Sequence, residues 1–288
     1  MYTISNGILQ ATILSKGAEL SSLILSATGD DYMWPAGPEW PKHSPVLFPI
    51  VGTLKNNTYF YGDKSYTLPR HGFAREKDFT VVEHFTDRIS LQLTDDESTH
   101  SVYPFAFKFI IVYALVNNAL HVTYHIQNNG NDVLYFSVGG HPAFKLPMEA
   151  ATDYNDYYLQ FNQNETAGRW PISPDGLIEN TPLPLLDNTN TLPLTKELFA
   201  KDALVFKNLQ SDAVTLTSDK TNKSLTFSFP GFNYLGLWAA KGADFICIEP
   251  WCGIADSVDA NQQLTDKEGV QSLEPQALFS QTWSVTLQ

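Results

Sequence analysis

Residues 107–126, FKFIIVYALVNNALHVTYHI, decide the fold class of this chain. Apolar side chains occupy every second position on both sides of Asn117-Asn118. A period of two places these side chains on one face of a strand, and paired asparagines are typical of a tight turn. The stretch therefore predicts a β-hairpin whose buried residues are Phe107, Phe109, Ile111, Tyr113, Leu115, Leu120, Val122, Tyr124 and Ile126.

The same alternation recurs toward both ends of the chain. Residues 8–25 are typical of two short strands, and residues 225–229 and 279–287 repeat the pattern. Helical periodicity is almost absent, and the best short helix covers residues 195–200 with Thr195 as its cap. We therefore predict an all-β fold, a large and mostly antiparallel sandwich.

Two irregular segments interrupt the strands. Residues 34–49 hold Trp34, Trp40 and five prolines, which excludes a helix or a central strand and predicts an ordered loop. Such a loop can form the rim of a site or a structural belt. Residues 162–194 are rich in Pro, Asn, Asp and Thr, but strand patterns lie on both sides of them. We therefore predict one domain over residues 1–288, with 162–194 as a long surface excursion.

The composition limits the class of partner. Hydrophobic residues make up 43% of the chain and charged residues 17%, which is typical of a globular protein. The net charge of −13 opposes binding to nucleic acid or to anionic membranes, because both attract basic patches. Small uncharged substrates fit this charge, as do anionic ones if a local arginine cluster outweighs it. A homodimer stays open.

The cysteines and the apolar runs indicate a cellular setting. Cys247 and Cys252 are the only cysteines, and they make neither a disulfide framework nor a tetrahedral zinc site. The first residues lack the basic and apolar regions of a signal peptide, and no apolar run reaches the roughly 20 residues that span a bilayer. We therefore expect a cytoplasmic protein.

Residues 244–253, DFICIEPWCG, hold the first candidate site residue, Glu249. Strand geometry places Phe245, Cys247 and Glu249 on one face. Burial there raises the pKa of a carboxyl group unless donors hold its charge. Trp251 supplies a flat apolar wall of the kind that stacks on sugar rings. The alternative is an edge-strand glutamate in water beside a core tryptophan.

Two histidines lie in comparable settings. His71 precedes a glycine, and His141 follows Gly139-Gly140, so each ring can be held in a defined orientation. The alternative for each is a hydrogen bond within its own turn. His121 and His125 share one strand face but would lie about 13 Å apart, too far for one ion. No metal-binding motif is present, so we predict no metal and no cofactor.

Four segments together resemble the aldose 1-epimerases, or mutarotases, in particular the shorter bacterial subgroup that includes the X protein of lactose operons. They are LFPIVG at residues 47–52, HGFAR at 71–75, VGGHPAF at 138–144 and CIEPWCG at 247–253. Their order and approximate spacing match the family over nearly the whole chain. The resemblance implies a galactose-mutarotase-like supersandwich with a cofactor-free site on its concave face.

The resemblance also implies roles for individual residues. His141 falls at the family's general acid, Glu249 at its general base, and His71 at the second histidine, which assists at the ring oxygen. Asp202 resembles the carboxylate that binds sugar hydroxyls. As a proton donor, His141 would be an imidazolium supported by a nearby carboxylate. Thr53 stands where the family often has an arginine, and this departure leaves the substrate class open.

The expected function is the interconversion of the α and β anomers of an aldohexose. A base takes the anomeric hydroxyl proton while an acid protonates the ring oxygen, and the ring opens. One alternative is a hexose-6-phosphate mutarotase, in which Arg70, Arg75 and Lys42 would meet the phosphate. The other is a sugar-binding protein that kept the fold without turnover. The partner in each case is a small sugar or sugar phosphate.

Overall fold

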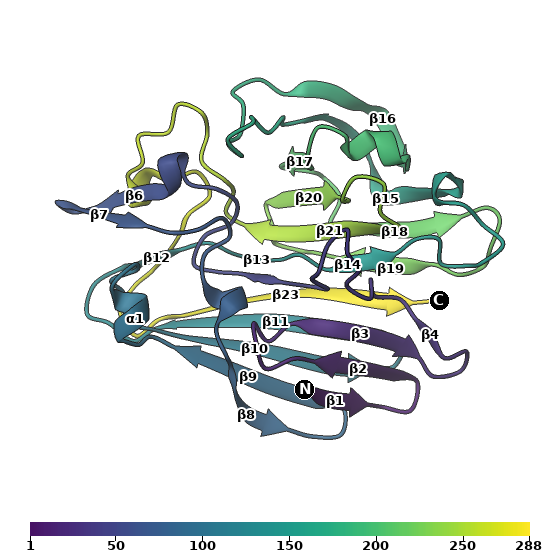
Figure 1. The fold of residues 1–288 in the computed structure, drawn as a ribbon, viewed down its shortest axis with the longest axis horizontal. Coiled ribbons are helices and arrows are strands. Elements are labelled where there is room, and N and C mark those ends of the chain that lie inside the picture. The colour runs from purple at the N-terminus through teal and green to yellow at the C-terminus, as the bar shows by residue number, and fades with distance from the viewer.

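A computed structural model describes residues 1–288, and its largest element is a nine-stranded antiparallel sheet (Figure 1). In spatial order its strands are β16 (Leu183–Pro193), β15 (Tyr157–Arg169), β18 (Ala213–Ser218), β19 (Leu225–Ser228), β23 (Leu278–Leu287), β11 (Ala119–Asn128), β10 (Phe107–Val116), β9 (Arg88–Thr94) and β8 (Thr80–His84).

The predicted hairpin lies within this sheet as β10 and β11. Phe107 pairs with Asn128 at one end and Val116 with Ala119 at the turn, where Asn117 has a φ of 53°. In both strands the apolar positions are buried and the residues between them are more exposed, as the period of two predicts. The all-β prediction is confirmed.

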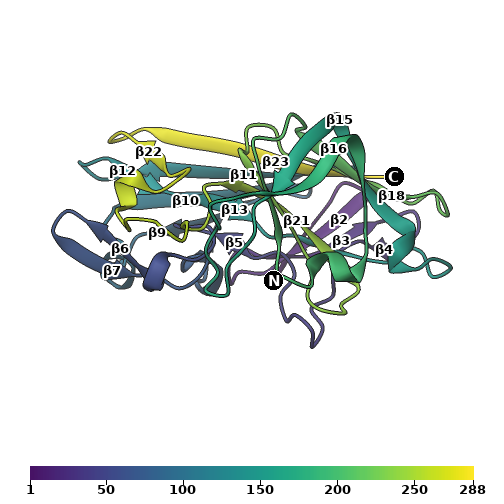
Figure 2. The same cartoon turned by 90° about the horizontal axis from the view of Figure 1, so that it is seen from above.

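Smaller sheets form a second layer against the large one, as the view in Figure 2 shows. Aromatic pairs join the layers: Phe144 contacts Phe227, and Phe206 contacts Phe161. One small sheet contains β17 (Leu204–Lys207), β20 (Tyr234–Trp238), β21 (Phe245–Cys252), β13 (Val138–Gly140), β5 (Val46–Leu47) and β14 (Ala143–Lys145). Another contains β1 (Tyr2–Ser5), β2 (Leu9–Ile13), β3 (Leu20–Leu25) and β4 (Asp30–Asp31).

The remaining elements are short. Two strand pairs are β12 (Leu134–Phe136) with β22 (Gln271–Leu273), and β6 (Thr58–Tyr61) with β7 (Lys64–Thr67). The α-helix is α1 (Glu97–His100), and the 3₁₀ turns are η1 (Lys55–Asn57), η2 (Ala74–Glu76), η3 (Tyr154–Asp156), η4 (Lys196–Phe199) and η5 (Leu264–Asp266). None of these helices has the length and apolar character needed to span a membrane.

Residues 162–194 differ from the prediction. They are no irregular excursion, because most of them belong to β15 and β16, a long hairpin at the edge of the large sheet. Register shifts interrupt the pairing between these strands, so the sequence does not alternate cleanly. The connecting residues 170–182 fold back toward the small sheet, where Ile178 N–H donates to the Asp256 carbonyl.

Two further predictions are modified. Residues 195–200 form only the 3₁₀ turn η4, and Thr195 precedes it without a side-chain capping bond. The loop over residues 34–49 serves in both of its predicted roles. Trp34 is buried and donates through Nε1 to the Trp40 carbonyl, while Trp40 lines a pocket.

Candidate active site

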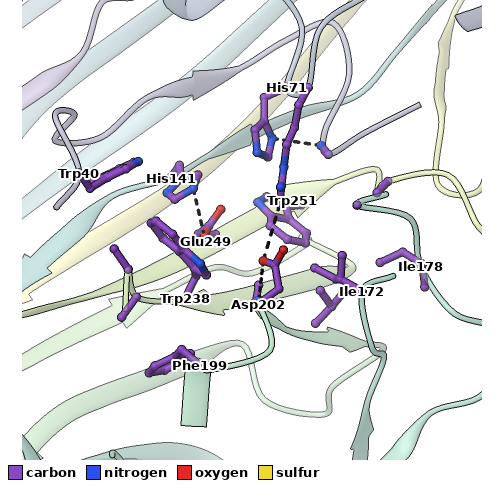
Figure 3. A pocket seen from close by; sticks show the side chains of 18 of the residues that line it. Trp40, His71, His141, Ile172, Ile178, Phe199, Asp202, Trp238, Glu249 and Trp251 are labelled. Atoms are coloured by element: carbon purple, nitrogen blue, oxygen red, sulfur yellow. Dashed lines mark hydrogen bonds and ion pairs between the residues drawn. The ribbon is translucent and has the colours of Figure 1, made fainter. Parts of the chain in front are cut away.

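A pocket of about 490 Å³ opens on the face of the six-stranded sheet that carries Glu249 (Figure 3). Its floor and walls combine aromatic rings with a few charged groups. The structure brings all six predicted site residues to this pocket: His71, Arg75, His141, Asp202, Glu249 and Trp251.

Strand β21 positions Glu249 at the pocket floor. The strand is central, since β20 pairs with one side of it and β13 and β14 with the other, and every residue in it is buried. Glu249 is 2% exposed and faces Gly236 of β20. The alternative of an edge-strand glutamate in water is therefore wrong.

His141 lies directly beside this carboxyl group. Its ring Nε2 is 3.4 Å from Oε1 of Glu249. The backbone N–H of His141 donates to the Pro45 carbonyl over 3.0 Å. The Trp40 ring stacks on the imidazole at 4.9 Å between centroids, and Trp238 meets it edge-on at 5.6 Å. The two indoles thus hold the histidine in one orientation and shield it from water.

His71 is held by the backbone of Gly52. The His71 N–H donates to the Gly52 carbonyl, and the Gly52 N–H donates to His71 Nδ1 over 3.0 Å. Because Nδ1 accepts a hydrogen bond, the neutral ring carries its proton on Nε2. Gly72 has a φ of 71°, and a Cβ there would lie 2.3 Å from the Phe48 carbonyl oxygen, so this turn requires glycine.

Burial sets the protonation of the Glu249–His141 pair. Loss of hydration raises the pKa of Glu249 well above its usual value, against the opposing charge of Arg70. The same cause lowers the pKa of His141 to about 3. The raised carboxyl pKa agrees with the prediction, whereas burial opposes the predicted imidazolium form of His141. Burial favours the neutral pair, with the proton on Glu249.

Three cationic side chains line the pocket. Nη2 of Arg70 lies 3.8 Å from Oδ1 of Asp202, which also accepts the Ala203 N–H. Arg75 donates to the Arg70 carbonyl over 2.8 Å, and its buried Nε has no partner. Lys241 also lines the pocket.

Lys42 does not join this group. Its Nζ pairs with Glu76 at 3.1 Å, and Lys42 is not among the residues that line the pocket. Its charge nevertheless acts on His141, so contact of Lys42 with a substrate phosphate stays a prediction.

Trp251 lines the pocket from a buried position. Its ring lies against Gly236, where a Cβ would come within 2.4 Å of the indole. The indole N–H is close enough to favour the charged form of Glu249. Neither Trp251 Nε1 nor Glu249 Oε2, however, has a partner within hydrogen-bond geometry. Stacking of Trp251 on a sugar stays a prediction.

Several lining residues escaped the sequence analysis. Trp238 ends the apolar run of β20, a signal that could have identified it. Ile172 and Ile178 lie in the connection between β15 and β16, whose polar composition gave no signal. Thr53 lies outside the pocket lining, under Gly176 of the same connection.

Comparisons with known proteins identify a family for this chain. The protein-family model described as aldose 1-epimerase matches residues 1–270 of this chain. The chain is 30% identical over 294 residues to the chromosomal protein LacX of Lactococcus lactis subsp. lactis, covering 99% of this chain and 98% of LacX.

Two solved structures have nearly the same fold. A galactose mutarotase related enzyme from Lactobacillus acidophilus is 37% identical with a TM-score of 0.95, covering 100% of this chain and 97% of that one. A galactose mutarotase-like protein from Lactobacillus casei is 29% identical with a TM-score of 0.94, covering 100% of both chains. The predicted galactose-mutarotase-like fold is confirmed.

Proposed function

The chain belongs to the aldose 1-epimerase family, and we propose that it interconverts the α and β anomers of an aldohexose by acid–base ring opening and closure. The observation that carries the proposal is the 3.4 Å approach of His141 to Glu249 inside an aromatic pocket. A neutral sugar suits such a pocket, because rings pack on its apolar carbons while a few polar groups meet its hydroxyls.

The pair can perform both proton transfers with a single proton of its own. With that proton on His141, Glu249 accepts the proton of the anomeric hydroxyl while His141 protonates the ring oxygen. The ring opens, the aldehyde end rotates, and closure reverses both transfers. Burial favours the proton on Glu249, so it must first cross to His141 over 3.4 Å. This shift changes no proton count, and hydrogen bonds from the sugar would favour the charged form.

The other pocket residues orient the sugar. His71 presents an Nε2–H donor, which can hold the ring oxygen or an adjacent hydroxyl, because its Nδ1 is occupied by Gly52. The Asp202 carboxylate accepts hydrogen bonds from sugar hydroxyls, and Arg70 donates them. Each positioned acid or base is worth about 10²- to 10⁴-fold in rate.

Polarimetry tests this function. Freshly dissolved α-glucose or α-galactose should approach its equilibrium rotation faster with the protein than in buffer alone, in proportion to protein concentration. Heat-denatured protein is the control for nonspecific catalysis. No acceleration with either sugar or with its 6-phosphate, although calorimetry detects binding, would establish the alternative of a sugar-binding protein without turnover.

A hexose-6-phosphate mutarotase is the second candidate, favoured by a specific observation. Arg70, Arg75 and Lys241 line the pocket of a chain whose net charge is −13. Arginine forks suit phosphate oxygens, and Arg75 Nε is free to donate. Comparing kcat/KM for α-glucose and α-glucose 6-phosphate decides between the two candidates.

A further inference from the structure

Cys247 lies beside the proposed acid–base pair, and the proposed reaction has no use for it. It precedes Glu249 by two residues in β21 and shares its face. One ligand atom from each of Cys247, His141 and Glu249 lies within 4.8 Å of the others. The three residues are 0%, 8% and 2% exposed. The side chains of His141, Cys247 and Glu249 therefore form one buried cluster of metal-ligating groups.

This cluster has unused bonding capacity. Cys247 forms no disulfide. Oε2 of Glu249 and Nδ1 of His141 are buried without any hydrogen-bond partner. Buried polar atoms are nearly always paired, so an unpaired carboxylate oxygen in this cluster calls for a physical explanation. An ion bonded to the carboxylate provides one, although an ion at His141 Nε2 leaves Nδ1 of the same ring unpaired.

We propose that His141, Cys247 and Glu249 bind Zn²⁺ and that the bound ion inhibits the protein. Imidazole, thiolate and carboxylate are the ligands that zinc prefers, and a site with three protein ligands leaves one position open. Bonds of about 2.0–2.3 Å in a tetrahedral site place the ligand atoms about 3.3–3.6 Å apart. The 3.4 Å between His141 and Glu249 fits this spacing.

The thiol must move to complete the site. Starting from the 4.8 Å limit, Cys247 Sγ has to approach the other ligands by roughly 1 Å, by rotation about its one side-chain torsion. Two protons leave to solvent as the ion binds, the Sγ–H proton of Cys247 and the carboxyl proton of Glu249. His141 and Glu249 line the pocket, which gives the ion a route to the site.

Charge balance favours this ion inside a buried site. The carboxylate and the thiolate together cancel its two positive charges, so the loaded site is neutral. Arg70, Arg75 and Lys42 lie near enough to act on the His141 charge and oppose a cation, which limits the affinity. The net charge of −13 attracts cations to the protein as a whole.

Inhibition follows because the ion takes the lone pairs of Glu249 and His141 that proton transfer needs. This part of the inference rests on the proposed function, whereas metal binding does not. Chelation should accordingly leave the activity intact or raise it, since the ion takes no part in the reaction.

Cobalt absorption tests the site without any measure of turnover. Co²⁺ added to the full chain should give the visible bands of tetrahedral cobalt and a thiolate charge-transfer band, both removed by Zn²⁺. Cys252→Ser is the matched control, because Cys252 is a second buried free cysteine in the same strand but outside the cluster. It should keep the thiolate band, and Cys247→Ser should lose it.

Glu249→Gln provides a second variant of nearly unchanged shape, in case Cys247→Ser does not fold. It should weaken Co²⁺ binding by about tenfold or more. An absent thiolate band in the native chain would overturn the site, as would a band that survives Cys247→Ser or an unchanged affinity in Glu249→Gln. Cobalt bands without any anomer interconversion would instead retain the site and refute the proposed function. Turnover unaffected by saturating Zn²⁺ would overturn the inhibition alone.

Discussion

His141 Nε2 lies 3.4 Å from Glu249 Oε1, although one residue follows β13 and the other lies in β21. The two strands are neighbours in the small sheet, where Val138 pairs with Cys252. Antiparallel pairing therefore places the turn after β13 next to the middle of β21. This contact joins two titratable groups that are far apart in the sequence into one buried pair.

Glu249→Gln should abolish most turnover while leaving sugar binding nearly intact. The amide keeps the size of the side chain and one hydrogen-bonding oxygen but cannot accept the hydroxyl proton. The rate should fall by about 10² or more, and affinity should stay within about tenfold. Polarimetry and calorimetry measure the two effects. Glu165→Gln is the control, since Glu165 is equally buried but lies outside the pocket. A normal rate in Glu249→Gln would refute the mechanism.

His141→Asn should lower kcat much more than it weakens substrate binding. Asparagine retains a hydrogen-bonding group between Trp40 and Trp238 but delivers no proton to the ring oxygen. A loss of about 10²-fold or more in kcat is expected from the missing acid. Steady-state kinetics separate kcat from KM. Near-normal turnover would transfer the acid role to His71.

The rate should decline on the alkaline side of the pH profile. The active pair carries one proton, loses it as the pH rises through the raised pKa of Glu249, and gains a second as the pH falls toward the His141 pKa of about 3. An ordinary glutamate has a pKa of about 4.3, and turnover should therefore persist at pH values below it. A rate that instead rises through that range and then stays level would indicate an ordinary Glu249 carboxylate.

Arg75→Ala distinguishes the two candidate substrates. If Arg75 meets a phosphate, the variant should lose roughly 1.5–3 kcal/mol of binding for α-glucose 6-phosphate and much less for α-glucose. Lys42→Ala is the matched control, because Lys42 pairs with Glu76 outside the pocket. Equal losses for both sugars would give Arg75 a structural role, such as holding the Arg70 carbonyl.

Lys267→Ala should destabilise the fold through Asp256. The two side chains are 3% and 4% exposed and lie 2.6 Å apart, and Asp256 Oδ2 also accepts the Lys55 N–H. Removing the lysine leaves an unpaired buried carboxylate, at a cost of about 3–5 kcal/mol in the free energy of unfolding. Urea denaturation measures this loss in the free energy of unfolding. Lys196→Ala, at a more exposed pair with Asp244, should cost about 1 kcal/mol or less; equal costs would contradict this account.

Much of the architecture follows from local pattern in the sequence. The alternation in residues 107–126 predicted β10 and β11, and the apolar run before Glu249 predicted β21 with Cys247 and Glu249 on one face. Local pattern failed at β15 and β16, where bulges break the period of two. One domain over residues 1–288 stays a prediction.

In residues 107–126 and 245–249 the sequence by itself determined the strands and the face that each side chain takes, because a strand's period of two depends only on neighbours along the chain. Tertiary structure alone decided that His141 meets Glu249 between two indoles, that Lys42 pairs with Glu76, and that Ile172 and Ile178 wall the pocket. It also set the directions in which the pKa values of Glu249 and His141 shift, since hydration is lost only when distant strands close over a charge.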